Sequence, residues 1–285
     1  MKTIAIVNQK GGCGKTTAAV NLAAALAARG RRSLLVDIDP LAHASLALGF
    51  VDDGSEKSIY DVLIDSFVPL DDIIRTHSKN LDFAPGIVIL RAAEFALYGA
   101  PARESRLRDK LARVAPRYDF AVIDCPSAGG LMTINALAAA DAAVVPVDSS
   151  PFALPGLEQL SEMIDMVRHE THRPLEVRAL CSMFDQRTRF ASEVFAELRQ
   201  RFGAKMYATA IRVNVKLREA FQRGQTIFEY APHSRGAADF AAFADEIALE
   251  ERFRRPARRI ASRGVVARRG ITLETIASSG ARRHG

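Results

Sequence analysis

The residues with the clearest potential for chemistry form a glycine-rich loop near the start of the chain, Lys10-Gly-Gly-Cys-Gly-Lys-Thr-Thr17. The loop follows an apolar run and opens an alanine-rich helical stretch, which is the context of a phosphate-binding loop. Glycines let backbone N–H groups approach phosphate oxygens, and the N-terminal end of the next helix attracts anions. Lys15 can neutralise β- and γ-phosphate charge, and the Thr16 hydroxyl can ligate Mg²⁺. The predicted nucleotide-binding residues are Gly11, Gly12, Cys13, Gly14, Lys15, Thr16 and Thr17.

Carboxylates stand at the ends of two further apolar runs. Asp37 and Asp39 close one run and, being two residues apart, share one side of an expected strand. Asp124 closes a later run and is placed to hold Mg²⁺ through water. The carboxyl ends of parallel strands face the ligand crevice of an open α/β sheet. We therefore expect these side chains beside the phosphate loop, together with a γ-phosphate-sensing loop at residues 126–130, whose glycines permit movement.

The elements that must position these groups alternate along the chain. Nearly unbroken apolar runs rich in Val and Ile suit strands buried on both faces. Such runs cover residues 3–7, 33–38, 120–124 and 142–147, with weaker candidates at 177–184 and 205–211. Helical patterns cover residues 15–29, 103–114, 131–140, 155–169, 190–202 and 236–250. This order predicts an α/β fold with a doubly wound, mostly parallel β-sheet flanked by helices.

The basic excess of the chain lies at its C-terminal end. The formal net charge is +6, but residues 251–285 hold ten Arg and two Glu, a net of +8, which leaves −2 for residues 1–250. We expect a P-loop nucleotide-binding domain over residues 1–250 and a basic, flexible tail without a stable fold over residues 251–285, with a weak amphipathic piece at 271–276. The tail could neutralise DNA phosphates or attach to an anionic membrane.

Composition narrows the class of protein and its compartment. No apolar run approaches the ~18–20 residues that span a bilayer. Cys13, Cys125 and Cys181 are widely spaced and form no CxxC motif, which fits a reducing cytosol and excludes a disulfide framework. The start of the chain lacks a signal-peptide pattern. These features predict a cytoplasmic globular protein.

The two lysines of the loop carry a resemblance to a known family. In its KGGxGKTT form the chain resembles the deviant Walker A ATPases of the ParA/MinD class. The resemblance implies ATP and Mg²⁺ as cofactors and a nucleotide-sandwich homodimer in which Lys10 reaches the phosphates bound by the partner subunit. It assigns Asp39 to orienting the attacking water, Asp37 to the Mg²⁺ environment, and Asp124 to the Walker B position.

Further segments are similar to small ParA (Soj-like) partition ATPases. They are Asn135-Ala-Leu137, Val145-Pro-Val147, Phe152-Ala-Leu-Pro-Gly156, the block from Ile211 to Ala220, and Tyr230 to Ala237. The resemblance implies an ATPase that binds nucleoid DNA non-specifically and segregates or positions a chromosome, plasmid or other cargo. A ParB-like or other cargo adaptor would stimulate hydrolysis, and the protein would be cytoplasmic and nucleoid-associated. By position in the late block, the predicted DNA-binding residues are Arg212, Lys216, Arg218 and Arg223.

Several residues depart from the family pattern and leave cargo and partner open. In Arg212-Val213-Asn214 the arginine stands one position earlier than in the family's Pro-Arg-Asn. Leu41 and His43 replace Gln and Asn after the Asp39-Pro40 pair, and Ser127 replaces the second proline after Asp124. The alternative within the class is a MinD-like membrane-associated positioning ATPase. Residues 256–285 contain no Phe, Trp, Tyr or Met, so stable membrane insertion is not expected. A metabolic P-loop enzyme is a third reading, although no motif supplies a substrate pocket.

Overall fold

The computed structural model of the chain describes residues 1–54, 56–148 and 155–266. Residues 1–246 form one compact unit, which carries the sheet, and a second unit begins at residue 247. Residues 152–154 of the family-like segment at 152–156 and the amphipathic piece expected at 271–276 lie outside the described residues. Within the described ranges no helix is both long and apolar enough to cross a bilayer.

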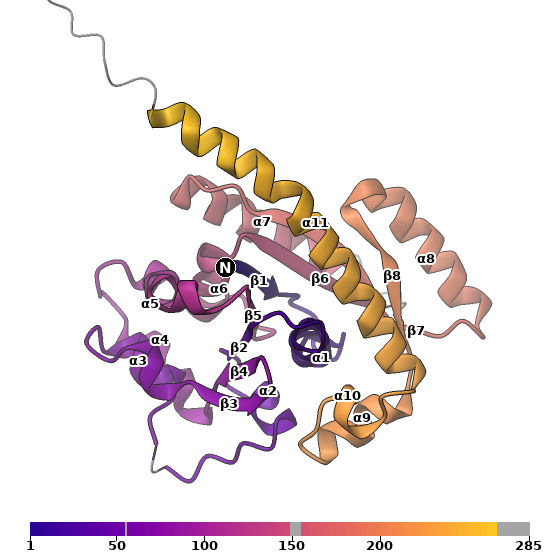
Figure 1. Cartoon of the computed structure of the whole chain (residues 1–285), viewed down its shortest axis with the longest axis horizontal. Coiled ribbons are helices and arrows are strands. Elements are labelled where there is room, and N and C mark those ends of the chain that lie inside the picture. The colour runs from indigo at the N-terminus through magenta and orange to yellow at the C-terminus, as the bar shows by residue number, and fades with distance from the viewer. Residues whose placement is uncertain (55, 149–154, 267–285) are drawn as a thin grey trace, which may run out of the picture. The chain divides into compact units, whose positions relative to one another are not determined.

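An eight-stranded sheet forms the centre of the first unit, with the strand order β3-β4-β2-β5-β1-β6-β7-β8 (Figure 1). Every neighbouring pair is parallel except β3 and β4. The strands are β1 (Lys2–Ile6), β2 (Ser33–Asp37), β3 (Arg75–Ser78), β4 (Leu81–Ala84), β5 (Phe120–Asp124), β6 (Ala142–Asp148), β7 (Glu176–Phe184) and β8 (Met206–Arg212). The predicted doubly wound, mostly parallel sheet is confirmed.

All six expected strands are present, and the two that the sequence did not predict lie together at one end of the sheet. The three central strands β1, β2 and β5 are buried at every residue, which explains their unbroken apolar runs. The edge strand β3 reads Arg-Thr-His-Ser and is half exposed. It has no apolar signal because only antiparallel pairing with β4 makes it a strand.

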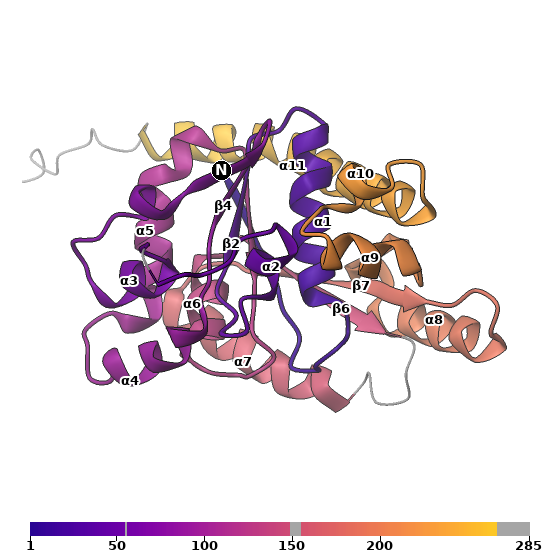
Figure 2. The same ribbon diagram turned by 90° about the horizontal axis from the view of Figure 1, so that it is seen from below.

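Helices cover both faces of the sheet. They are α1 (Lys15–Ala28), α2 (His43–Ala47), α3 (Ile59–Ile64), α4 (Ala93–Ala96), α5 (Arg106–Val114), α6 (Leu131–Ala139), α7 (Pro155–Thr171), α8 (Arg189–Phe202), α9 (Val215–Gln222), α10 (Ile227–Tyr230) and α11 (Arg235–Val266). Short 3₁₀ turns add η1 (Leu70–Ile73), η2 (Val88–Ala92), η3 (Arg103–Ser105), η4 (Ala115–Arg117) and η5 (Gly203–Lys205). In Figure 2, α1 lies on one face, and α5 and α6 lie on the other.

The basic C-terminal region differs from the sequence expectation. We expected no stable fold after residue 250, yet helix α11 continues to Val266. Arg, Ala and Glu are strong helix formers, so a helix that has begun at Arg235 can continue through this segment. The shortage of large apolar residues after residue 250 argues against a packed core there, but it does not argue against a helix.

Candidate nucleotide site

The glycine loop connects β1 to α1 and has the backbone geometry of a phosphate cradle. Gly12 and Gly14 have φ angles of 73° and 89°, a region that residues with a Cβ adopt only with strain. Gly14 is the N-cap of α1, and no side chain caps that end of the helix. The first N–H groups of α1 are thus left to satisfy a ligand, which is the arrangement that binds phosphate.

The loop lines a cavity of about 560 Å³. This volume lies within the usual range of ligand pockets, roughly 300–1,000 Å³. One end of the cavity is formed by the glycine loop, the first turn of α1, Asp39 and Ser127. The rest of the lining contains the apolar residues Met183, Ile211, Val213, Val215, Leu217, Phe221 and Phe240, together with the polar or charged residues Ser182, Arg212, Asn214 and Arg218. A cationic glycine loop beside this mixed lining matches a nucleotide with its phosphates on the loop.

Lys15 joins the phosphate loop to the loop after β5. Its side chain is buried, and Nζ donates hydrogen bonds to the Lys10 carbonyl oxygen at 3.0 Å and to Ser127 Oγ at 2.7 Å. Ser127 is one of the residues that depart from the family pattern, and here its hydroxyl is a direct partner of the lysine. The contact links the loop at 126–130 to the cation expected to hold the phosphates.

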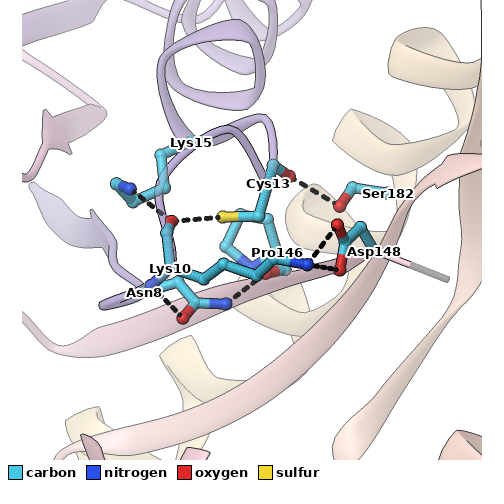
Figure 3. Close-up of polar contacts among 7 residues, drawn as sticks. All are labelled: Asn8, Lys10, Cys13, Lys15, Pro146, Asp148 and Ser182. Carbon is cyan, nitrogen blue, oxygen red and sulfur yellow. Dashed lines mark hydrogen bonds and ion pairs between the residues drawn. The ribbon is translucent and has the colours of Figure 1, made fainter. Parts of the chain in front are cut away.

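Lys10 has a different partner in the single chain. Its Nζ lies 2.6 Å and 2.7 Å from the two carboxylate oxygens of Asp148, the last residue of β6 (Figure 3). The Lys10 side chain is 25% exposed and that of Asp148 16% exposed, so the pair is partly shielded from water. The loop is also pinned to β7, because Ser182 Oγ donates to the Cys13 carbonyl oxygen at 2.7 Å.

The Cys13 thiol is buried in this loop. Burial raises its pKa, although the nearby Lys15 opposes the shift. A position at a helix N-terminus tends to lower a thiol pKa. The structure reverses that direction because desolvation outweighs the local positive potential. Cys13 therefore has the character of a small packed residue rather than of a reactive thiolate.

Two buried carboxylates meet beside the loop. Asp37 and Asp124 are paired residues of the neighbouring strands β2 and β5. Burial raises the pKa of Asp37 to about 6, while hydrogen bonds from Ser45 and the Asp39 N–H oppose the shift. Burial and the charge of Asp37 raise the pKa of Asp124 well above its usual value.

The oxygens of Asp124 fit the requirements of a cation site. Both are buried and accept no hydrogen bond of ordinary geometry from the residues described. An unpaired buried carboxylate is strongly destabilising unless a cation compensates it. The described residues contain no cluster of three or more metal-ligating side chains. Mg²⁺ commonly uses one or two carboxylates and completes its coordination with phosphates and water. Asp37, Asp124 and the Thr16 hydroxyl fit that pattern.

Asp39 lines the cavity close to the phosphate end. It is nearly buried, and its Oδ1 accepts a hydrogen bond from the Leu41 N–H at 2.9 Å. His43 lines the same cavity and contacts the ring of Phe221 edge-on, with centroids 6.1 Å apart. The segment after Asp39 is thus packed against α9, on the far side of the cavity.

The four residues predicted to bind DNA lie in two different environments. Arg212 and Arg218 line the cavity. Arg212 is held by Asp239, with Nε 3.0 Å from each carboxylate oxygen. Lys216 pairs with Glu219 at 2.8 Å on the exposed part of α9, and Arg223 lies over the ring of Tyr230.

Sequence reasoning missed the part of the cavity lining that comes from β7, β8 and α9. Ser182 and Met183 come from the end of β7, and Met183 has a positive φ of 52°, which the local sequence does not predict. The sequence could have predicted the start of α9, because Asn214 is a favourable N-cap residue and its side chain accepts a hydrogen bond from the Lys216 N–H. That cap marks the helix but does not reveal which of its residues face the cavity.

Comparison with known proteins agrees with this geometry. A sequence model described as an AAA domain matches residues 1–177. The sporulation initiation inhibitor protein Soj of Bacillus subtilis (strain 168) is 43% identical over 248 residues, which cover 87% of this chain and 98% of Soj. The chain belongs to the ParA/Soj family of P-loop ATPases.

One further sequence relative and one solved structure are also similar to this ParA-family chain. The chromosome partitioning protein ParA of Myxococcus xanthus (strain DK1622) is 38% identical over 262 residues, covering 91% of this chain and 92% of that protein. A solved structure of cobyrinic acid a,c-diamide synthase from Mycobacterium smegmatis, with bound ATP analog and magnesium, superposes with a TM-score of 0.78. It is 29% identical, and the match covers 88% of this chain and 96% of the synthase chain.

Proposed function

We propose that this ParA-family chain binds ATP with Mg²⁺ and hydrolyses it by phosphoryl transfer to water. The observation that carries the proposal is that Lys15 and Asp39 line one nucleotide-sized cavity and both interact electrostatically with the buried Asp124 behind it. Lys15 would stabilise charge on the transferred phosphoryl group, and Asp39 would orient the attacking water. Thr16, Asp37 and Asp124 would hold Mg²⁺, which neutralises phosphate charge when bound.

The second lysine supports a catalytic homodimer. In the single chain the Lys10 ammonium is engaged by Asp148, so it does not act on the phosphates of its own site. We propose that ATP binding brings two chains face to face and that each Lys10 exchanges Asp148 for the phosphates bound by the partner. A cation delivered in this way acts as an arginine finger does, because it completes charge stabilisation only in the complex.

The proposed output is the positioning of cargo on DNA. The ATP dimer would bind nucleoid DNA non-specifically, and a ParB-like or other cargo adaptor would stimulate hydrolysis. Lys216 and Arg223, on exposed parts of the chain, and Arg218 are the proposed contacts to DNA phosphates. Arg212 is better placed to shape the nucleotide cavity, because Asp239 holds its guanidinium there.

A metabolic activity is the second candidate, since a synthase superposes on most of this chain. The two functions differ in what ATP turnover requires. A partition ATPase hydrolyses ATP without a small-molecule acceptor and is stimulated by a protein and DNA. A synthase turns over ATP only with its acceptor and amino donor.

Co-sedimentation and ATPase assays test the proposal directly. Wild-type protein is mixed with ATP and either non-specific duplex DNA or anionic liposomes, with Lys15→Ala as the variant that lacks the phosphate lysine. ATP-dependent sedimentation with DNA, lost in Lys15→Ala and in about 0.5 M salt, supports the partition function. Sedimentation with liposomes alone would favour the membrane-associated alternative. No ATP hydrolysis with or without DNA would contradict the ATPase proposal.

A further inference from the structure

A serine hydroxyl on the loop after β5 lies at the nucleotide cavity, beside the phosphate lysine. Ser127 lines the cavity and is half-buried, and its Oγ accepts a hydrogen bond from Lys15 Nζ at 2.7 Å. An ammonium group only donates, so this contact uses a lone pair of the hydroxyl and leaves its proton for another acceptor. Within the residues that the structure describes, the Ser127 hydroxyl donates to no other protein group. The side chain therefore offers a hydrogen-bond donor to a ligand in the cavity.

The residues that follow Ser127 hold this part of the loop in place. Thr133 Oγ1, in the first turn of α6, donates to the Ala128 carbonyl oxygen at 2.6 Å. Glu94 Oε1, in α4, accepts from the Leu131 N–H at 2.8 Å and so caps α6 from another element. A group that is positioned before its ligand arrives loses less conformational freedom on binding. Ser127 is therefore a preformed part of the cavity wall.

The ligand that suits this donor is the terminal phosphate of a nucleoside triphosphate. Lys15 Nζ also donates to the Lys10 carbonyl oxygen at 3.0 Å (Figure 3), so the ammonium bridges the glycine loop and the loop after β5. In such a loop the backbone N–H groups hold the α- and β-phosphates, and the lysine reaches the β- and γ-phosphates. Ser127 touches that lysine but is not part of the glycine loop. The phosphate left for its hydroxyl is therefore the γ-phosphate.

We propose that the Ser127 hydroxyl donates a hydrogen bond to the γ-phosphate and by this contact distinguishes ATP from ADP. The inference rests on the proposed ATPase function and adds a specificity-determining residue to it. Oγ continues to accept from Lys15 with either nucleotide, whereas its proton finds a phosphate acceptor only in ATP. Proline, which the family pattern carries at this position, has no hydroxyl. The contact therefore belongs to this chain's own departure from that pattern.

A role limited to orienting Lys15 leads to a different result. In that case removal of the hydroxyl would weaken ADP and ATP together, because the lysine contacts the β-phosphate that both nucleotides share. A hydroxyl that donates to the γ-phosphate affects ATP alone when it is removed. The ratio of the two dissociation constants separates the two roles, with ADP as an internal reference.

The test measures the dissociation constants of ADP and of a non-hydrolysable ATP analogue, both with Mg²⁺, by competition against a fluorescent nucleotide. The full-length protein is compared with Ser127→Ala, Ser127→Pro and Ser127→Thr, at concentrations where sedimentation shows monomers with either nucleotide. The first two variants lack the hydroxyl and the third keeps it. Ser182→Ala is the matched control, because Ser182 also lines the cavity but its hydroxyl already donates to the Cys13 carbonyl oxygen at 2.7 Å (Figure 3).

We expect Ser127→Ala and Ser127→Pro to weaken binding of the ATP analogue roughly tenfold or more, while ADP binding changes by less than about twofold. Ser127→Thr should keep the wild-type ratio, and Ser182→Ala should change both dissociation constants by the same factor or neither. An unchanged ratio in both variants that lack the hydroxyl would overturn the inference, whether they bind the two nucleotides normally or both more weakly. Wild-type protein that binds neither nucleotide would overturn the proposed ATPase function itself.

Discussion

The ion pair between Lys10 and Asp148 gives a quantitative prediction about dimerisation. If Lys10 must leave Asp148 to reach the partner's nucleotide, then Asp148→Asn, which keeps the size but removes the charge, should favour the dimer. The two side chains are 25% and 16% exposed, and Nζ contacts both carboxylate oxygens. A partly shielded, charge-assisted hydrogen bond contributes about 1.5–3 kcal/mol, which corresponds to roughly 10- to 150-fold in an equilibrium constant.

The assay is the dimer dissociation constant with a non-hydrolysable ATP analogue, measured for wild type and Asp148→Asn. We expect the variant to dimerise at a protein concentration roughly tenfold lower or more, with nucleotide affinity of the monomer unchanged. Asp185→Asn is the matched control, because Asp185 also pairs with a basic residue, Arg187, but on the exposed β7–α8 connection. If Asp148→Asn dimerises no better than Asp185→Asn, the ion pair does not restrain Lys10 and the reasoning is wrong.

Four other variants address the remaining roles. Lys10→Ala should bind ATP yet remain monomeric by light scattering, and dimers in ATP would contradict the role of the lysine. Asp39→Ala should keep the ATP dimer on DNA while slowing hydrolysis at least about 100-fold; an unchanged rate would remove Asp39 from the mechanism. Burial raises the pKa of Asp37 to about 6, so above that pH its ionised form destabilises the metal-free folded state. The free energy of unfolding without metal should therefore increase as pH falls from 7 to 5. Asp37→Asn should reduce this pH dependence, leaving the part that Asp124 contributes, and raise the metal-free melting temperature, while weakening stabilisation by Mg²⁺ with nucleotide. Lys110→Met should destabilise the fold by about 2–4 kcal/mol in urea unfolding, because the buried Lys110 ammonium donates to the carbonyl oxygens of Asp65, Ser66 and Val68.

The sequence was most informative where function depends on contiguous residues. The glycine loop, its preceding strand and its following helix are encoded within residues 2–28, and the structure has them as expected. The six predicted strands were found because buried parallel strands carry apolar runs on both faces. Short elements such as α2, α9 and β3 were missed, since their pairing and packing partners, rather than their own composition, stabilise them.

Residues brought together across the sheet were beyond the reach of the sequence. Lys10 and Asp148 are 138 positions apart, and Lys15 and Ser127 are 112 apart. The strand order β2-β5-β1-β6, which is set by packing of the whole sheet, decides that they meet. Arg212, whose DNA-binding role stays a prediction, pairs with Asp239, 27 positions further along the chain, beside the cavity.

The sequence by itself determined the family and the sheet, because each is encoded by local spacing and by runs of apolar residues; the phosphate chemistry that the same residues imply stays a prediction. Only the tertiary structure decided which charged groups pair in the single chain and which apolar residues stay uncovered. The segment between β4 and α5 illustrates the difference, since Leu90 and Phe95 are both large apolar residues, yet Leu90 is fully buried and Phe95 is 85% exposed. Burial depends on what lies across the fold from a side chain, and that is a property of the packed molecule rather than of its local sequence.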